Sequence, residues 1–111
     1  MDDADLDAAA TAIAATGYGN AGQVCISTKR VLAVRPIYGD LLDAVKPKVS
    51  AIQVGNPLAE DTKMGPMIRE ADAQRVHDWL DEAVAAGAKI VTGGHREGTH
   101  HEATLVSDVK P

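Results

Sequence analysis

Cys25 is the residue in this sequence with the clearest capacity for nucleophilic chemistry. It lies in a turn of small residues, Asn20-Ala21-Gly22-Gln23-Val24-Cys25-Ile26-Ser27. Glycine lets the backbone turn tightly, so the thiol and the N–H of the same residue can both face a substrate. A nucleophile beside an oxyanion donor is a recurring arrangement in acyl transfer. The alternative interpretation is a buried structural cysteine, because free cysteine is among the most buried residue types.

A thiol reacts as its thiolate, which forms at neutral pH only in a positive or dipolar setting. Lys29 and Arg30 follow Cys25 closely, but nothing in the sequence directs either of them toward the sulfur. Cys25 is the only cysteine, so a disulfide within the chain and a cysteine-rich zinc site are excluded. A small thiol-redox protein is the least favoured hypothesis, because no second cysteine could resolve a disulfide.

Histidine and carboxylate side chains gather near the end of the sequence, at His95, His100, His101 and Glu102. Adjacent His100 and His101 would point to opposite sides of a strand. We therefore interpret this stretch as a solvated loop and expect no metal site. His77 lies on the polar face of a predicted helix and is expected to be an ordinary surface residue.

Three segments have the apolar spacing of helices. Residues 38–49 form one of them, and Pro47 predicts a kink or an early end there. Residues 69–86 form the clearest helix, with Trp79 and Leu80 in its apolar stripe and Gly87 at the C-terminal cap position. The first helix is predicted over residues 2–16, and the carboxylates that suit its positive end are Asp2, Asp3, Asp5 and Asp7.

Short apolar runs predict strands at residues 30–34, 88–92 and 104–106. The run at 30–34 is expected to be buried on both faces, as strands of parallel sheets are. Residues 54–66 contain prolines and glycines and form a long loop, a kind that is often functional. Helices that alternate with strands predict an α/β fold, with a largely parallel sheet and flanking helices.

The composition narrows the class of protein. The 111 residues are 45% hydrophobic and 24% charged with a net charge of −5, which argues against a nucleic-acid binder. No apolar run approaches the length of a membrane helix, and no leader is recognised, so we expect a cytoplasmic protein without membrane contact. Only 3% of residues are aromatic and none is Phe, so the core must be thin. We therefore expect the chain to pack against something else.

The segment from Tyr18 to Ile26 resembles the cysteine signature of the NAD(P)-dependent aldehyde dehydrogenase superfamily. The four fixed positions of that signature are present as Tyr18, Gly22, Gln23 and Cys25. Further segments resemble the family in the same order along the chain. These are the acidic start at residues 2–7, the run at 29–34, the loop segments at 54–58 and 65–68, and the junction at 86–94.

The resemblance implies a mechanism and a set of site residues. The Cys25 thiolate would attack an aldehyde to give a thiohemiacetal, hydride would pass to NAD or NADP, and water or coenzyme A would release the thioester. Val24 and Ile26 match positions that line the aldehyde pocket in the family, although packing of the loop explains them equally well. Arg75 falls near the position where relatives place a basic residue that contacts the cofactor, although an exposed Arg on a helix is usually just solvated. Relatives are dimers or tetramers, so a homo-oligomer is expected.

The sequence also departs from the family pattern. The general-base Glu, the oxyanion Asn and the cofactor-binding domain lie upstream in relatives and are absent from these residues. His100 and Ala103 stand where the family usually has an aromatic residue and a Pro. Residues 1–111 are therefore interpreted as a partial catalytic domain without the cofactor-binding domain. Its function is predicted to be aldehyde oxidation as part of a longer enzyme, and the alternative is an inactive piece that serves as a structural or interaction module.

Overall fold

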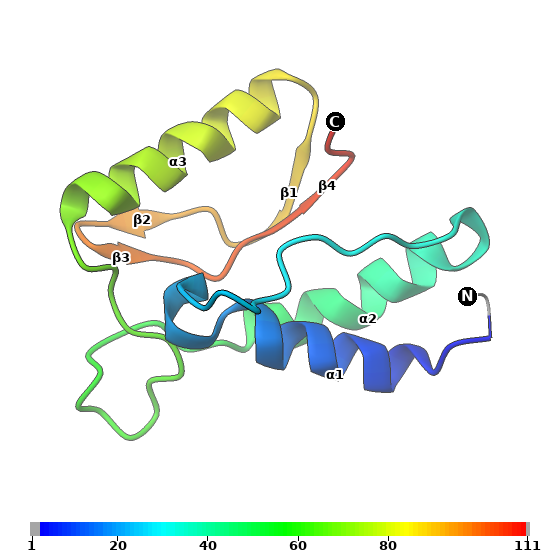
Figure 1. Cartoon of the computed structure of the whole chain (residues 1–111), viewed down its shortest axis with the longest axis horizontal. Helices are drawn as coiled ribbons and strands as arrows, with labels where there is room; N and C mark the ends of the chain where they lie inside the picture. The colour runs from blue at the N-terminus through cyan, green and yellow to red at the C-terminus, as the bar shows by residue number, and fades with distance from the viewer. Residues whose placement is uncertain (1–2, 111) are drawn as a thin grey trace.

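A computed structural model describes residues 3–110 of the chain. A pair of helices, α1 (Leu6–Gly17) and α2 (Tyr38–Ser50), forms one side of the molecule (Figure 1). The other side consists of α3 (Glu70–Ala85), which lies over short strands. The remaining elements are η1 (Gly19–Gly22), η2 (Arg35–Ile37), β1 (Lys89–Thr92), β2 (Arg96–Glu97), β3 (His100–His101) and β4 (Leu105–Ser107). The predicted α/β class is confirmed.

Helix α1 begins with a side-chain cap from Asp5. The backbone of Asp5 is extended, and its carboxylate accepts a hydrogen bond from the N–H of Ala8 at 3.0 Å. This bond satisfies one of the free amides at the start of the helix. The carboxylate-rich start was predicted, but the helix begins later than residue 2 because Asp5 supplies the cap. The predicted contribution of Asp2 lies outside the described residues.

Helix α2 continues through Pro47 to Ser50, so the predicted early end is wrong. A proline inside a helix removes one backbone hydrogen bond and crowds the preceding turn. The last turn is nevertheless held by packing, because Val45 and Val49 on the same face are only 3% and 1% exposed. Tertiary packing commonly outweighs a local helix preference.

The main core lies between α1 and α2. Ala10 of α1 is fully buried and packs in one cluster with Val45 and Val49 of α2. Leu41 of α2, Met64 from the long loop and Ala103 from the segment before β4 complete the buried cluster. An alanine at the contact lets two helices approach closely, but it contributes little apolar area. The core is therefore small, as the composition predicts.

The end of α3 is a glycine cap of the Schellman type. Gly87 has a φ of +105°, and its N–H donates to the carbonyl of Val84 at 2.9 Å. The N–H of Ala88 donates to the carbonyl of Ala83, also at 2.9 Å. These two bonds satisfy carbonyls that the helix leaves free, and glycine adopts the left-handed conformation without steric cost. The predicted cap is confirmed.

The predicted parallel sheet is not found among residues 3–110. Strands β1 and β4 pair antiparallel, and β2 and β3 form a separate antiparallel pair. The parallel pairing that occurs in this part of the chain is an isolated bridge between Val54 and Met64. Parallel neighbours need a crossover connection, usually a helix. Between β1 and β4 the chain forms only the β2–β3 hairpin, so β4 returns antiparallel to β1.

Residues 30–34 do not form the predicted strand. Leu32 is 96% exposed, and Val31 and Val34 are also exposed, so this run is not buried on both faces. An extended segment becomes a strand of a sheet only when its backbone pairs with a neighbour. No other segment of residues 3–110 lies alongside to make that ladder.

The histidine-rich stretch is ordered, so its interpretation as a solvated loop is wrong. The hairpin of β2 and β3 contains His100 and His101, and His101 is only 8% exposed. The N–H of Glu102 donates to the carbonyl of His95, while the N–H of His95 donates to the Glu102 carboxylate at 3.0 Å. The turn of the hairpin is tied to the long loop, because Met67 donates its N–H to Thr99.

Two glycines in this region allow a test of close backbone packing. Gly93 has a φ of +76°, and a Cβ there would lie 2.2 Å from the carbonyl oxygen of Ala103. Gly98 also has a positive φ, +58°, but a Cβ there would meet nothing within 4 Å. We expect Gly98→Ala to lower the free energy of unfolding by about 1–2 kcal/mol, the cost of the left-handed conformation. Gly93→Ala should lower it by roughly 1–3 kcal/mol more, because the backbone must shift.

Urea unfolding followed by Trp79 fluorescence measures both changes, because Trp79 is the only tryptophan. Equal losses in the two variants would contradict the close contact between Gly93 and Ala103.

Candidate active site

The loop that carries Cys25 begins with an unusual backbone. Asn20, Ala21 and Gly22 follow one another with φ values of +51°, +53° and +74°. Left-handed conformations are uncommon for residues with a Cβ, and Ala21 has no side-chain hydrogen bond to offset the strain. This left-handed stretch reverses the chain directly after α1. It brings Gln23 and the cysteine that follows back past the end of that helix.

Cys25 occupies the tip of a tight turn. The N–H of Ser27 donates to the carbonyl of Val24 at 3.0 Å, so Cys25 and Ile26 are the two central residues of the turn. The Cys25 side chain is exposed, and Ile26 is 85% exposed. The interpretation of Cys25 as a buried structural cysteine is therefore wrong. Within residues 3–110 the N–H of Cys25 donates to no protein acceptor, so thiol and N–H are available together.

The residues that follow Cys25 in the chain are bonded to the end of α1. The Ser27 hydroxyl donates to the carbonyls of Gly17 at 2.9 Å and Thr16 at 3.0 Å. The hydroxyls of Thr28 and Thr16 share a hydrogen bond of 2.7 Å. The last carbonyls of a helix have no partner within it, so these side chains satisfy groups that would otherwise need water. The segment that follows Cys25 is thus attached to the end of a rigid helix.

Tyr18, the aromatic position of the cysteine signature, connects this region to the strands. It follows α1 directly, and its hydroxyl donates to the carbonyl of Thr104 at 3.0 Å. Burial raises the pKa of the Tyr18 phenol, because the charged form would lose its hydration. The hydroxyl therefore remains a donor at neutral pH, and it ties the start of the cysteine loop to the segment before β4.

An apolar groove of about 390 Å³ lies between the cysteine loop and α3. Tyr18, Ala21 and Gly22 line one side, and Val76 and Trp79 of α3 line the other. The backbone that leads into Cys25 therefore forms a wall of this groove.

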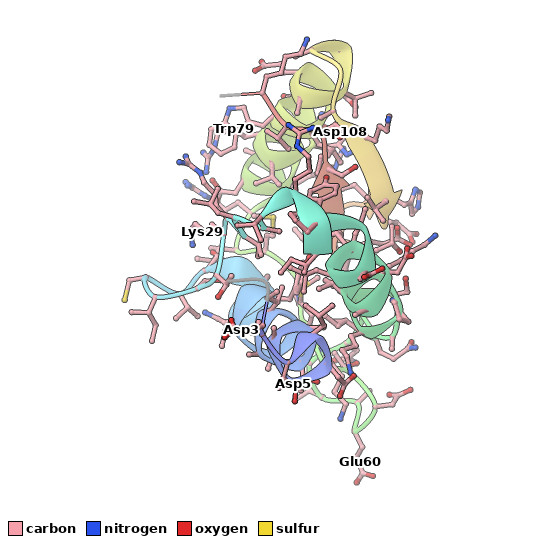
Figure 2. The ribbon with its side chains drawn as sticks, turned by 90° about the vertical axis from the view of Figure 1, so that its right-hand side faces the viewer. Asp3, Asp5, Lys29, Glu60, Trp79 and Asp108 are labelled. Carbon is pink, nitrogen blue, oxygen red and sulfur yellow. The ribbon has the colours of Figure 1, made fainter. Side chains whose placement is uncertain are left out.

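Arg75 lies on the outer face of α3, and its position is set by two neighbours. Its guanidinium is 3.1 Å from the carboxylate of Asp72 and lies 5.5 Å from the centre of the Trp79 ring. Trp79 and Leu80 both belong to the predicted apolar stripe, but Trp79 is 58% exposed and Leu80 is buried. Trp79 and Lys29 lie on the same side of the molecule (Figure 2). No contact within residues 3–110 joins Arg75 to Cys25.

Asp72 also binds a second arginine, Arg69, through a hydrogen bond of 3.0 Å. The hydrogen bond from Arg69, together with the positive charges of Arg69 and Arg75, holds the pKa of the Asp72 carboxyl below its usual range. Asp72 is therefore ionised at neutral pH and restrains both guanidinium groups.

The structure pairs two histidines that the sequence analysis treated separately. Nδ1 of His77 and Nε2 of His101 are 3.4 Å apart, and Nδ1 of His101 is 3.0 Å from the carbonyl of Glu102. His77 is half-buried rather than an ordinary surface residue. The two residues are 24 positions apart, so no spacing in the sequence indicates this contact. The role of Ser27 was also missed, although a small polar residue two positions after the cysteine is a signal that could have revealed it.

Two kinds of feature are missing from residues 3–110. No group of three or more His, Cys, Asp and Glu side chains comes together in a way that could hold a metal ion. None of the helices is long and apolar enough to cross a membrane.

Comparison with known proteins gives a consistent result. The profile of the aldehyde dehydrogenase family matches residues 1–111. The 3-sulfolactaldehyde dehydrogenase of Priestia aryabhattai is 45% identical over 107 residues, which are 96% of this chain and 22% of that protein. The chain therefore spans about a fifth of the length of the curated relatives it matches.

Solved structures agree with the sequence relatives. The NADP-dependent glyceraldehyde-3-phosphate dehydrogenase of Bacillus halodurans C-125, complexed with NADP, superposes with a TM-score of 0.95 at 32% identity. The match covers 100% of this chain and 23% of that one. The NAD-dependent aldehyde dehydrogenase of Sinorhizobium meliloti superposes with a TM-score of 0.91 at 39% identity, over 97% of this chain and 22% of that one.

The bonds from Ser27 to α1 generate a prediction about the order of the cysteine turn. We expect Ser27→Ala to lower the free energy of unfolding by about 1–2 kcal/mol, because the part-buried Gly17 carbonyl loses its side-chain donor. The turn should also open more often, so trypsin should cut faster after Lys29 and Arg30, as measured by mass spectrometry of the products.

Thr11→Ala is the matched control. The Thr11 hydroxyl donates to the carbonyl of Asp7 on the exposed surface of α1. Its removal therefore leaves the contacts of the cysteine turn unchanged. Equal rates of cutting after Lys29 in the two variants would contradict the role of Ser27.

Proposed function

The chain belongs to the aldehyde dehydrogenase family, and on this premise we propose that it supplies the nucleophile of an enzyme that oxidises an aldehyde to a carboxylic acid with NAD or NADP. The observation that carries the proposal is the position of Cys25. Its thiol and its unbonded N–H are exposed together at the tip of a turn whose last residue, Ser27, is bonded to the end of α1. The chain spans about a fifth of its relatives, so we propose that it acts as part of a longer enzyme.

The proposed chemistry is addition to the aldehyde followed by oxidation. The Cys25 thiolate forms a C–S bond to the carbonyl carbon, and the carbonyl oxygen becomes an oxyanion held partly by the Cys25 N–H. Bound NAD or NADP would supply the two-electron oxidant, so that loss of hydride from this carbon would leave a thioester on Cys25. Water then adds to the thioester, the C–S bond breaks, and the carboxylic acid leaves with the thiolate restored.

Val24 and Ile26 are proposed to contact the aldehyde. They flank Cys25 within the same turn, and both side chains are apolar. Ile26 is 85% exposed, so in this chain it is free to meet a ligand, while Val24 is half-buried and nearer the loop interior. We assign Ile26 the larger contribution for that reason.

Arg75 is proposed to contact the cofactor. Its guanidinium uses one N–H donor on Asp72 and lies over Trp79, so further donors remain for phosphate or ribose oxygens. An ordered, half-exposed arginine beside an aromatic ring fits a nucleotide ligand. Arg75 is the residue among 3–110 that we propose to contact NAD or NADP. We propose that other parts of the longer enzyme supply most of the cofactor-binding contacts.

We propose a cytoplasmic homo-oligomer as the working form. The single thiol is exposed, which suits a reducing compartment. Large apolar side chains such as Leu32, Leu58 and Ile68 are each at least 80% exposed, which favours contact with further protein. The same exposed side chains support a second candidate, in which this chain by itself is an inactive structural or interaction module.

The nucleophile is tested in the full-length enzyme. Cys25→Ala should abolish aldehyde-dependent formation of NADH or NADPH, followed by absorbance, because no other thiol in this segment can form the thioester. Binding of NAD or NADP should persist, which shows that the variant is folded. Turnover close to that of the unmodified enzyme would overturn the proposal.

The two candidate functions differ in what the 111-residue chain does alone. We expect no turnover with any aldehyde from the isolated chain, because acid–base and oxyanion groups each contribute about 10²- to 10⁴-fold and come from elsewhere in the enzyme. An immunoblot of the native protein then separates the candidates. A band several times larger than 11.6 kDa supports the enzyme, and a band at 11.6 kDa supports the inactive module.

A further inference from the structure

We infer that Lys29 is a positioning residue for Cys25, an inference that rests on the proposed role of Cys25 as the nucleophile. The Lys29 ammonium donates to the carbonyl of Val24 at 3.3 Å and to the carbonyl of Gly22 at 3.4 Å. It therefore bridges the two sides of the loop whose tip is Cys25. Sequence proximity alone did not show where this side chain points.

The bridge acts on the atoms that define the turn. The Val24 carbonyl already accepts the N–H of Ser27, which closes the turn, and Lys29 adds a second, charged donor to the same oxygen. Hydrogen bonds from a charged donor are stronger than neutral ones. The same ammonium also donates to the Gly22 carbonyl, and Gly22 belongs to the left-handed stretch with a φ of +74°. Lys29 therefore links the Val24 carbonyl to that stretch. Lys29 thus restrains the backbone immediately before Cys25, including the peptide that carries its N–H.

Lys29 also places a positive charge in the loop. Within residues 3–110 no carboxylate makes an ion pair with its ammonium, so the charge is not neutralised by a partner. The ammonium is bonded to neutral carbonyls, so no carboxylate competes for it and its donors remain on the turn.

The alternative is a solvated lysine whose contacts have no effect on Cys25. Arg30, the next residue, is exposed and makes no ion pair or side-chain hydrogen bond within residues 3–110. A general effect of nearby positive charge should therefore come from Arg30 as well as from Lys29. A bridging effect should come from Lys29 alone, and this difference separates the two explanations.

Alkylation of Cys25 in the 111-residue chain provides the test, because Cys25 is its only cysteine and is exposed. The rate of reaction with iodoacetamide, a neutral reagent, is measured by mass spectrometry from pH 6 to 10. Lys29→Met should lower the rate at pH 7 by roughly two- to fivefold, the scale expected for the loss of exposed bonds from a charged group. Lys29→Arg should recover most of the rate, because it keeps a charged donor.

Two controls make the result specific. Arg30→Met and Lys46→Met each remove one positive charge without touching the carbonyls of the turn, and both should react like the unmodified chain. Iodoacetate, an anionic reagent, separates attraction of the reagent from an effect on the thiol. A loss confined to iodoacetate, an equal loss in Arg30→Met, or an unchanged rate in Lys29→Met would each overturn the inference.

The two experiments distinguish a failure of this inference from a failure of the proposed function. If Lys29→Met leaves alkylation unchanged while Cys25→Ala abolishes turnover of the full-length enzyme, Cys25 is the nucleophile and Lys29 does not position it. If Lys29→Met slows alkylation while Cys25→Ala leaves turnover intact, Lys29 controls the thiol but the proposed function is wrong.

Discussion

The arrangement of the candidate site depends on how the end of α1 is bonded. Helices leave their last carbonyls without partners. In this chain the next segment folds back to supply them, with the Ser27 hydroxyl on Gly17 and Thr16. Tyr18, at the same helix end, reaches across to Thr104. These bonds hold the cysteine loop between a helix and the strand segment, and that is why Cys25 occupies an ordered turn on an otherwise exposed surface.

The buried core of this chain is small, and the cysteine loop is held mainly by its own hydrogen bonds to α1. The buried cluster consists mainly of Ala10, Val45, Val49, Met64 and their neighbours, which contribute modest apolar area. Large side chains such as Leu32, 96% exposed, and Leu58, 91% exposed, remain uncovered. Burying one such side chain is worth about 1.5–3 kcal/mol, so further protein packed on these faces would add substantially to stability. Local hydrogen bonds at the loop do not depend on that covering.

Charge is distributed differently in the cysteine loop and on α3. In the loop the Lys29 ammonium is bonded only to neutral carbonyls. On α3 the Arg75 guanidinium is balanced by Asp72, which also binds Arg69. The Lys29 ammonium therefore restrains backbone, whereas the paired guanidinium of Arg75 beside Trp79 is held in one orientation.

Features set by neighbours in the sequence could be predicted from the sequence alone. The Asp5 cap, the Gly87 cap and the cysteine signature depend on residues within a few positions of one another, and residue type decides them. Other features required the tertiary structure. The course of α2 through Pro47, the exposure of residues 30–34, the antiparallel strands and the contact between His77 and His101 depend on which distant segments lie alongside. Packing and strand pairing between such segments leave no fixed spacing in a single sequence, which is why only the fold could decide them.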